Sequence, residues 1–368
     1  MFNSDIFALV PLQFPGLPAT TRIDARAHEC TPRIEDINQA ITECRSRSAW
    51  QRAISVLHDT KPSVRPTIIT YNAVISACEK AAQWLPIPHL LEDAKLQNLR
   101  PSVVTYNTII SATRTSGRWE LVLGFMQEML WNSIPWDVIT YNSGINALGH
   151  CYCWSMALSL LHDAEGEDFA TNTITYNASM SACARAGQWQ QVLCILRDAQ
   201  LRRIQSDIVS YNTAISTCDK SGHWQQALCL LEEICSRHVQ PDAVTFNAVI
   251  SACSESWVTA LHMLRQIARV YVQPTLVSYN SAIAACKTEG RWELATALLE
   301  EAVAQEMRAN AITYSAVISA CEVDEQWETA LCLLQAMEEL SVVAHCAAIC
   351  VCGRSGQWQH ALSLFTDI

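Results

Sequence analysis

The sequence predicts an all-α fold, an α-solenoid built from about ten helix-turn-helix repeats of 35 residues. Two observations lead to this prediction. A motif of the type Ile-Thr-Tyr-Asn recurs along the chain, mostly every 35 residues, and a Trp follows twelve residues after the end of each motif, or ten in the seventh unit. We call the last motif position the anchor; the ten anchors are Asn38, Asn72, Asn107, Asn142, Asn177, Asn212, Asn247, Asn280, Ser315 and Cys346. Such periods are typical of stacked helical hairpins that share one continuous core.

The first half of each unit predicts a helix that is apolar on one face. Apolar residues lie one position before the anchor, where Tyr is usual, and three positions after it, where Ile or Met is invariant among the ten units. The position six after the anchor is Cys in eight units. Steps of three and four define one face of an α-helix. Because Cys is small and apolar, its row predicts close helix packing more than chemistry.

The second half of each unit predicts another helix after a turn of the Gly-Gln-Trp type. Residues 225–233 are an example of its amphipathic pattern, and Pro often precedes the next unit, where the helix must stop. In the second unit, Pro86 and Pro88 fall in the first turn of this helix. One Pro is tolerated there and two are awkward, so we expect a bent or delayed helix.

The repeats predict one extended domain over residues 34–368, with degenerate first and last units. Residues 1–33 lie outside the repeat and form an N-terminal leader, either targeting or disordered: Arg22 and Arg26 favour a transit peptide, whereas Asp5 and Asp24 oppose it. The chain stops at Ile368, inside the second helix of the last unit and without a polar cap. Because solenoids usually have such caps, an uncapped end and a truncated product both stay open.

Composition excludes several classes of protein. The 368 residues carry 25 Lys and Arg against 36 Asp and Glu, a net charge of −11, which argues against indiscriminate binding to nucleic acid or anionic membranes. No apolar stretch reaches the roughly 18 residues that span a bilayer. The 17 Cys form no Cys-x-x-Cys pair, which predicts reduced intracellular thiols and no metal site. Without a zinc-deaminase signature, a phosphate loop or a carboxylate cluster, we expect neither an enzyme nor a cofactor.

Units that begin Val-Thr-Tyr-Asn and continue to Ile-Ser-Ala-Cys resemble the pentatricopeptide repeat family of P-type, the modular RNA-binding solenoids of organelles. The pairing of Ser-Ala-Cys with Gln-Trp is similar to the repeats of algal protists, and the resemblance covers about nine-tenths of the chain. It implies a right-handed superhelix, a monomer, single-stranded RNA as partner, and a role in RNA processing, stability or translation in a chloroplast or mitochondrion, with protein partners for processing. Tetratricopeptide repeats differ, because their Trp lies early in the first helix.

The anchor row is the candidate base-reading row. Asn is a poor helix former, yet it recurs here in eight of ten units, and its amide can donate to and accept from a base edge. The resemblance implies that each anchor reads one base together with the residue five positions before the next anchor. These pairs are Asn72 with Ser102, Asn107 with Asp137, Asn142 with Asn172, Asn177 with Asp207, Asn212 with Asp242, Asn247 with Thr275, and Asn280 with Asn310, and Asn38 with Thr67 is a weaker one. The Asn/Asp pairs imply uracil, Asn72 with Ser102 implies cytosine, and the whole target is pyrimidine-rich, about eight nucleotides long. Ser315 with Ser341 stays unassigned, since their interval is four residues short.

Two further rows accompany the anchors. A β-branched residue lies three positions before nine anchors and could wedge between bases: Ile69, Val104, Ile139, Ile174, Val209, Val244, Val277, Ile312 and Val343. Eight positions after the anchor, where the family places phosphate-facing bases, the chain has Lys80, Arg185, Lys220 and Arg354. Acids cluster late in the second helices, as at Glu232 and Glu233, and we expect them on the outer layer. Only four groove cations predict modest affinity and a shallow salt dependence.

Each row also has a structural alternative. The polar residues five positions before the anchors are good helix N-caps, and this alone could explain them. The Val and Ile row could be ordinary core between helices, and the Asn row could bridge adjacent repeats. At the level of function, the groove could bind protein as tetratricopeptide arrays do, or the chain could be a decayed repeat protein.

Overall fold

The computed structural model describes residues 34–60, 65–166, 171–270, 272–337 and 341–366, and within these ranges it contains twenty α-helices and two short 3₁₀ helices, but no strand. The first helices of the ten units are α1 (Ile34–Ser46), α3 (Ile68–Lys80), α5 (Val103–Thr113), α7 (Val138–His150), α9 (Thr173–Arg185), α11 (Ile208–Lys220), α13 (Ala243–Ala252), α15 (Leu276–Thr288), α17 (Ala311–Ala320) and α19 (Val342–Arg354). The second helices are α2 (Trp50–Thr60), α4 (Ile87–Leu96), α6 (Trp119–Trp131), α8 (Trp154–Gly166), α10 (Trp189–Leu201), α12 (Trp224–Ser236), α14 (Trp257–Arg269), α16 (Trp292–Ala304), α18 (Trp327–Gln335) and α20 (Trp358–Thr366). The 3₁₀ helices η1 (Arg114–Ser116) and η2 (Cys253–Glu255) extend α5 and α13. The predicted all-α fold is confirmed.

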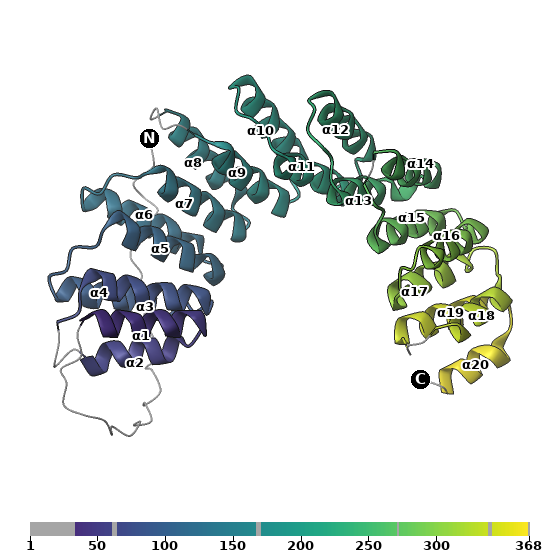
Figure 1. Ribbon diagram of the computed structural model, residues 1–368, viewed down its shortest axis with the longest axis horizontal. Coiled ribbons are helices and arrows are strands. Elements are labelled where there is room, and N and C mark those ends of the chain that lie inside the picture. The colour runs from purple at the N-terminus through teal and green to yellow at the C-terminus, as the bar shows by residue number, and fades with distance from the viewer. Residues whose placement is uncertain (1–33, 61–64, 167–170, 271, 338–340, 367–368) are drawn as a thin grey trace.

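The hairpins stack side by side into a curved ribbon (Figure 1). Each first helix packs against the second helix of its own unit and against the first helix of the next unit. The first helices follow the inner side of the curve and the second helices the outer side, as α7 to α13 show most clearly (Figure 1). The inner helices therefore line the concave side of the ribbon, which we call the groove, and each unit presents the same positions to it.

The row one position before the anchors forms the centre of each hairpin. The aromatic residues of this row in the second to eighth units are 2% exposed or less, whereas Tyr314 of the ninth is only partly buried. Several of these hydroxyls donate to an acid late in the second helix: Tyr71 to Asp93 at 2.8 Å, Tyr106 to Glu128 at 2.8 Å, Tyr211 to Glu233 at 3.1 Å and Tyr279 to Glu301 at 3.0 Å. Burial, helped by the neighbouring carboxylate, raises the pKa of Tyr211 and of Tyr279 to about 12. The outer acids thus satisfy buried phenols, which would otherwise destabilise the hairpin.

The Cys row is part of the same core, as predicted. Cys78, Cys183, Cys218 and Cys286 are fully buried between helices. Burial raises the pKa of Cys78 to about 12 and that of Cys183 to about 11, so these thiols stay protonated and unreactive at neutral pH.

The second helices begin at the repeated Trp in nine units, and α4 is the exception. It begins at Ile87, three residues after Trp84, with Pro88 in its first turn. The predicted delay is therefore confirmed. Its cause is Pro88, which in a helix that began at Trp84 would have no N–H for the Trp84 carbonyl and would clash with it. With the start at Ile87, Pro88 lies in the first turn, where Pro is tolerated.

The predicted leader, residues 1–33, lies outside the described residues, and the first helix begins at Ile34. None of the helices in the described ranges combines the length and apolar character that crossing a membrane requires.

Candidate nucleic-acid interface

The polar residues five positions before the anchors are N-caps of the first helices, so the capping interpretation is confirmed. Seven of the eight side chains accept a hydrogen bond from the backbone N–H three residues on: Ser102, Asp137, Asn172, Asp207, Asp242, Thr275 and Asn310. The N···O distances at the three Asp caps are 2.6, 2.9 and 2.8 Å. The eighth residue, Thr67, caps α3 with its backbone in the same extended conformation.

The structure brings the anchors and these caps together across the boundary between units. The Nδ2 group of Asn107 donates to Oδ1 of Asp137 at 3.2 Å, and Asn177 donates to Asp207 at 3.1 Å. The same bond joins Asn212 to Asp242 at 3.3 Å, and Asn247 to the hydroxyl of Thr275 at 3.2 Å. The three Asn/Asp pairs that the family resemblance assigns to uracil are thus real pairs in space.

The other end of the same amides accepts from a hydroxyl of the next unit. Thr140 donates to Oδ1 of Asn107 at 2.8 Å, and Thr245 donates to Asn212 at 2.6 Å. Equivalent bonds reach Asn38 from Thr70, Asn177 from Ser210, and Asn247 from Ser278. The Asn row therefore does bridge adjacent repeats. Because an amide has two N–H donors and two acceptor lone pairs, these contacts leave one of each unused at Asn107, Asn177, Asn212 and Asn247.

At three anchors, the Oδ1 atom does not accept a hydrogen bond from the next unit. The buried Oδ1 atoms of Asn72, Asn142 and Asn280 have no hydrogen-bond partner among the described residues. Their partners in the next unit are Ser102, Asn172 and Asn310, so none of the three faces an Asp cap. These amides are held less firmly than those of the Asn/Asp pairs.

Hydrogen bonding also fixes the charge of the Asp caps. Partial burial by itself raises the pKa of Asp137, but hydrogen bonds from Thr140 and Asn107 outweigh it and hold the pKa below the usual Asp value. The pKa of Asp207 and that of Asp242 are lowered for the same reasons. At neutral pH all three caps are anionic, so they keep each Asn oriented with Nδ2 toward the carboxylate.

The β-branched row is exposed, which overturns its interpretation as core. Ile69, Val104, Ile139, Ile174, Val209, Val244, Val277, Ile312 and Val343 are each between 54% and 67% exposed. They lie in the first turn of the inner helices, one per unit, beside the anchors. A regular row of side chains that are more than half exposed contributes little to the core of the stack.

The predicted phosphate residues Lys80, Arg185, Lys220 and Arg354 end the inner helices α3, α9, α11 and α19 and are exposed. Three have acids close by: Glu79 directly precedes Lys80, Asp219 directly precedes Lys220, and Glu322 pairs with Arg354 at 3.2 Å. Arg185 instead lies near two further basic groups, Arg114 and His150. Sequence reasoning missed Arg114 because it stands seven, not eight, positions after its anchor.

Charge is divided between the two layers as expected. Helices α3 to α19 of the inner layer, with η1 and η2, carry six Lys and Arg against three Asp and Glu. The outer helices α4 to α20 carry four against thirteen. The net charge of −11 therefore resides mainly on the outer layer, although the Asp caps also border the groove. Among the described residues, no group of three or more His, Cys, Asp or Glu could hold a metal ion.

These features define a class of protein: a helical-repeat solenoid whose groove repeats an amide, a capping oxygen and an exposed aliphatic side chain. The sequence comparisons give the particular family. The PPR repeat family model matches residues 101–150 and 206–255, and the PPR repeat model matches residues 174–204, 277–305, 312–342 and 343–368. The chain belongs to the PPR, or pentatricopeptide repeat, family. No curated protein matches the sequence.

One solved structure shares the fold, and two others align with lower scores. The crystal structure of the pentatricopeptide repeat protein PPR10 from maize aligns with a TM-score of 0.66 at 18% identity, over 91% of this chain and 53% of that one. PPR10 in complex with an 18-nt psaJ RNA element aligns at 0.45 and 16%, over 95% and 60%. The PPR domain of Arabidopsis thaliana protein-only RNase P 1 in complex with tRNA aligns at 0.35 and 12%, over 55% and 90%. The fold is thus the expected right-handed solenoid, and the chain spans about half the length of PPR10.

Proposed function

We propose that this chain binds single-stranded RNA in its groove and reads one base with each repeat. One observation carries the proposal: at every anchor from Asn72 to Asn280, an amide lies beside an aliphatic side chain that is more than half exposed. An apolar wedge and a hydrogen-bonding group are the two things that an unstacked base requires. PPR10, which has the same fold, forms a complex with an RNA element.

The geometry suggests how one base is held. A base over Asn177 lies between Ile174 of its own unit and Val209 of the next, so both of its faces meet aliphatic groups. The amide of Asn177 already donates one N–H to Asp207 and accepts from Ser210, which leaves one donor and one lone pair for the base edge. Because the amide is oriented before binding, little ordering entropy is lost when the base arrives.

Each pair of an anchor and the cap of the next unit sets the base that is preferred at that place in the groove. The hydrogen-bonded pairs formed by Asn107, Asn177 and Asn212 with their Asp caps prefer uracil, as the family resemblance implies. Asn72 with Ser102 prefers cytosine, and the pairs of Asn142, Asn247 and Asn280 accept pyrimidines more loosely. The target is a pyrimidine-rich single strand of about eight nucleotides with uracil in the middle.

The biological effect we propose is occlusion. A bound segment is hidden from nucleases and from its own pairing partners, without any catalytic step by this chain. Such an activity suits RNA processing, stability or translation in an organelle, with other proteins supplying chemistry where cleavage occurs.

The test is a selection from a random single-stranded RNA pool on the purified protein, with the flow-through pool sequenced as control. We expect enrichment of pyrimidine-rich sequences with uracil at the positions of the Asn/Asp pairs. No enrichment, or a purine-rich motif, would contradict the proposal, and the protein-binding scaffold would then explain the groove better.

A further inference from the structure

Three basic groups from successive units converge at the inner layer between the third and fifth repeats. They are Arg114 of η1, His150 at the end of α7 and Arg185 at the end of α9. Partial burial lowers the pKa of His150, and the charges of Arg185 and Arg114 lower it further. Partial burial and the charge of Arg114 likewise lower the pKa of Arg185. His150 and Arg185 therefore both lie within the field of neighbouring positive charge.

A glycine allows this convergence. Gly149 of α7 lies so close to α9 that a Cβ atom built on it would be 2.7 Å from Cβ of Ala182 and 3.1 Å from an Nη atom of Arg185. The guanidinium of Arg185 thus lies against the backbone of α7, one residue before His150. A larger residue at Gly149 would push α9 and this guanidinium away.

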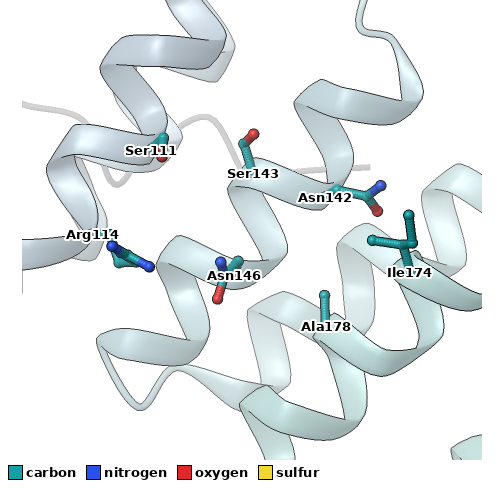
Figure 2. Close-up of a pocket in the computed structure, with 7 residues that line it drawn as sticks. All are labelled: Ser111, Arg114, Asn142, Ser143, Asn146, Ile174 and Ala178. Carbon is teal, nitrogen blue, oxygen red and sulfur yellow. The ribbon is translucent and has the colours of Figure 1, made fainter. Parts of the chain in front are cut away.

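A polar pocket of about 190 Å³ lies beside Arg114. It is lined by Ser111, Arg114, Asn142, Ser143, Asn146, Ile174 and Ala178 (Figure 2). The side chain of Arg114 extends toward Asn146 on one side, and the anchor Asn142 with the exposed Ile174 forms the other (Figure 2). The candidate base-reading position of the fourth unit therefore opens directly onto a cation and several neutral hydrogen-bonding groups. None of the seven lining residues is acidic, although one of them, Ser111, donates to Glu79.

The position seven residues after the anchor, where Arg114 stands in the third unit, carries other side chains elsewhere in the groove. Seven positions after the anchor, the second, sixth and ninth units have Glu79, Asp219 and Glu322, whereas the third to fifth have Arg114, Gly149 and Ala184. The second-unit acid accepts a hydrogen bond from Ser111, and Glu322 pairs with Arg354. No ion pair to an acid is found for Arg114 or Arg185 within the described part of the chain. Positive charge is thus concentrated in one place.

We propose that Arg114, His150 and Arg185, with Asn146, form a phosphate-binding site in the fourth unit. Guanidinium groups bind phosphate oxygens through paired N–H donors, and two of them without an acid repel each other until an anion arrives. The ligand is a phosphate oxyanion, either free or as one phosphodiester of the bound strand, and the second case rests on the proposed function. The strand is then anchored at one linkage instead of being held evenly along the groove.

The first experiment replaces single linkages of a bound oligonucleotide by neutral methylphosphonates, one position at a time. We expect the linkage at the fourth unit to cost about tenfold in affinity, the size of a charge-assisted hydrogen bond, and the others about threefold or less. Arg114→Gln and Arg185→Gln should each cost about tenfold as well. Lys287→Gln is the matched control, because Lys287 of α15 stands seven positions after its anchor as Arg114 does, and it should cost less than about threefold.

The second experiment needs no RNA. The imidazole of His150 is followed by NMR in sodium phosphate and in sodium chloride of equal ionic strength, with His150→Gln to identify its signal. Phosphate should raise the pKa of His150, and Arg114→Gln should abolish the rise. If phosphate acts in this way but no RNA binds, the site stands and the proposed function fails. A flat methylphosphonate profile, together with an unchanged His150, would overturn the site while leaving RNA binding intact.

Discussion

Two stretches of the same groove differ in how their anchors are held. From the third to the seventh unit, four of the five anchors are hydrogen-bonded to the cap of the next unit. In the last two units the anchors are Ser315, whose hydroxyl donates back to Ile312 of its own helix, and Cys346, which is exposed. Ser341 ends the series as an N-cap without a side-chain bond. Val343 nevertheless remains 67% exposed.

The comparison separates a feature that helix geometry fixes, the exposed aliphatic row, from one that depends on side-chain identity, the amide network. The exposed aliphatic row continues to the end of the chain because its position in the first turn of each inner helix always faces the groove. The amide network instead depends on the side chains that meet: its last bonds join Asn247 to Thr275 and Ser278, whereas Asn280, opposite Asn310, has an Oδ1 atom without a partner among the described residues. Under the proposed function, base reading therefore belongs to the units with Asn anchors, and the last two contribute only nonspecific contact.

The largest expected effect comes from placing a charge in the aliphatic row. Ile174→Asp should weaken RNA binding by about tenfold to a hundredfold, because one base loses its apolar contact and meets a negative charge. Val343→Asp is the matched control and should cost less than about threefold. Fluorescence anisotropy with the selected RNA measures both. Helical circular dichroism should not change, since both side chains are exposed and an acid is favourable in a first turn. Equal losses at the two positions would remove the distinction between the two stretches.

An N-cap residue in the middle of the solenoid should contribute more to the free energy of unfolding than the N-cap residue of the last unit. Asp207→Ala removes the acceptor for Ser210 and for Asn177, so the free energy of unfolding should fall by about 1 kcal/mol. Ser341→Ala should change it by less than about 0.5 kcal/mol, because its side chain makes no cap bond. Urea denaturation gives both values. Asp207→Asn, which keeps the capping oxygen, should restore most of the loss, and failure to do so would mean that the charge and not the cap stabilises the helix.

The smallest expected effect is a pH dependence of RNA affinity that arises from His150 in the fourth unit. The pKa of His150 is lowered in the free protein, so its imidazole is neutral at pH 7, between Arg114 and Arg185. A bound phosphate favours the charged imidazole, and RNA affinity should therefore rise about two- to threefold as pH falls from about 7.5 to 5.5. Anisotropy titrations across this range test the effect. In His150→Gln the rise should vanish, and a rise that persists would assign the titration to another group.

Much of the fold can be predicted from the sequence because ten units share one pattern, so the residue types allowed at each position can be seen within the chain itself. The helix pairs, the buried Tyr and Cys rows, the N-caps and the delayed start of α4 all rest on local rules of spacing, capping and Pro geometry. Whether the Val and Ile row faced the core or the groove did not follow, because an aliphatic residue suits both and the curvature of the stack decides.

The basic cluster followed from the sequence only in part. Arg185 is one of the predicted phosphate residues and His150 stands at the same offset of eight, but Arg114 stands seven positions after its anchor, so the spacing does not group the three. Their approach depends on Gly149, which brings α7 and α9 together. The bonds between anchors and caps were predictable as pairs, but their simultaneous role as bridges between units became visible only in three dimensions.

The most direct test of reading by single repeats is to change one anchor and repeat the RNA selection. Asn212→Thr leaves Asp242 in place, and the family resemblance implies that Thr with Asp prefers guanine. The account predicts that one central position of the selected motif moves from U toward G while all other positions keep their preference. An unchanged motif, or an equal loss of preference at every position, would show that the anchor row serves only to join the repeats.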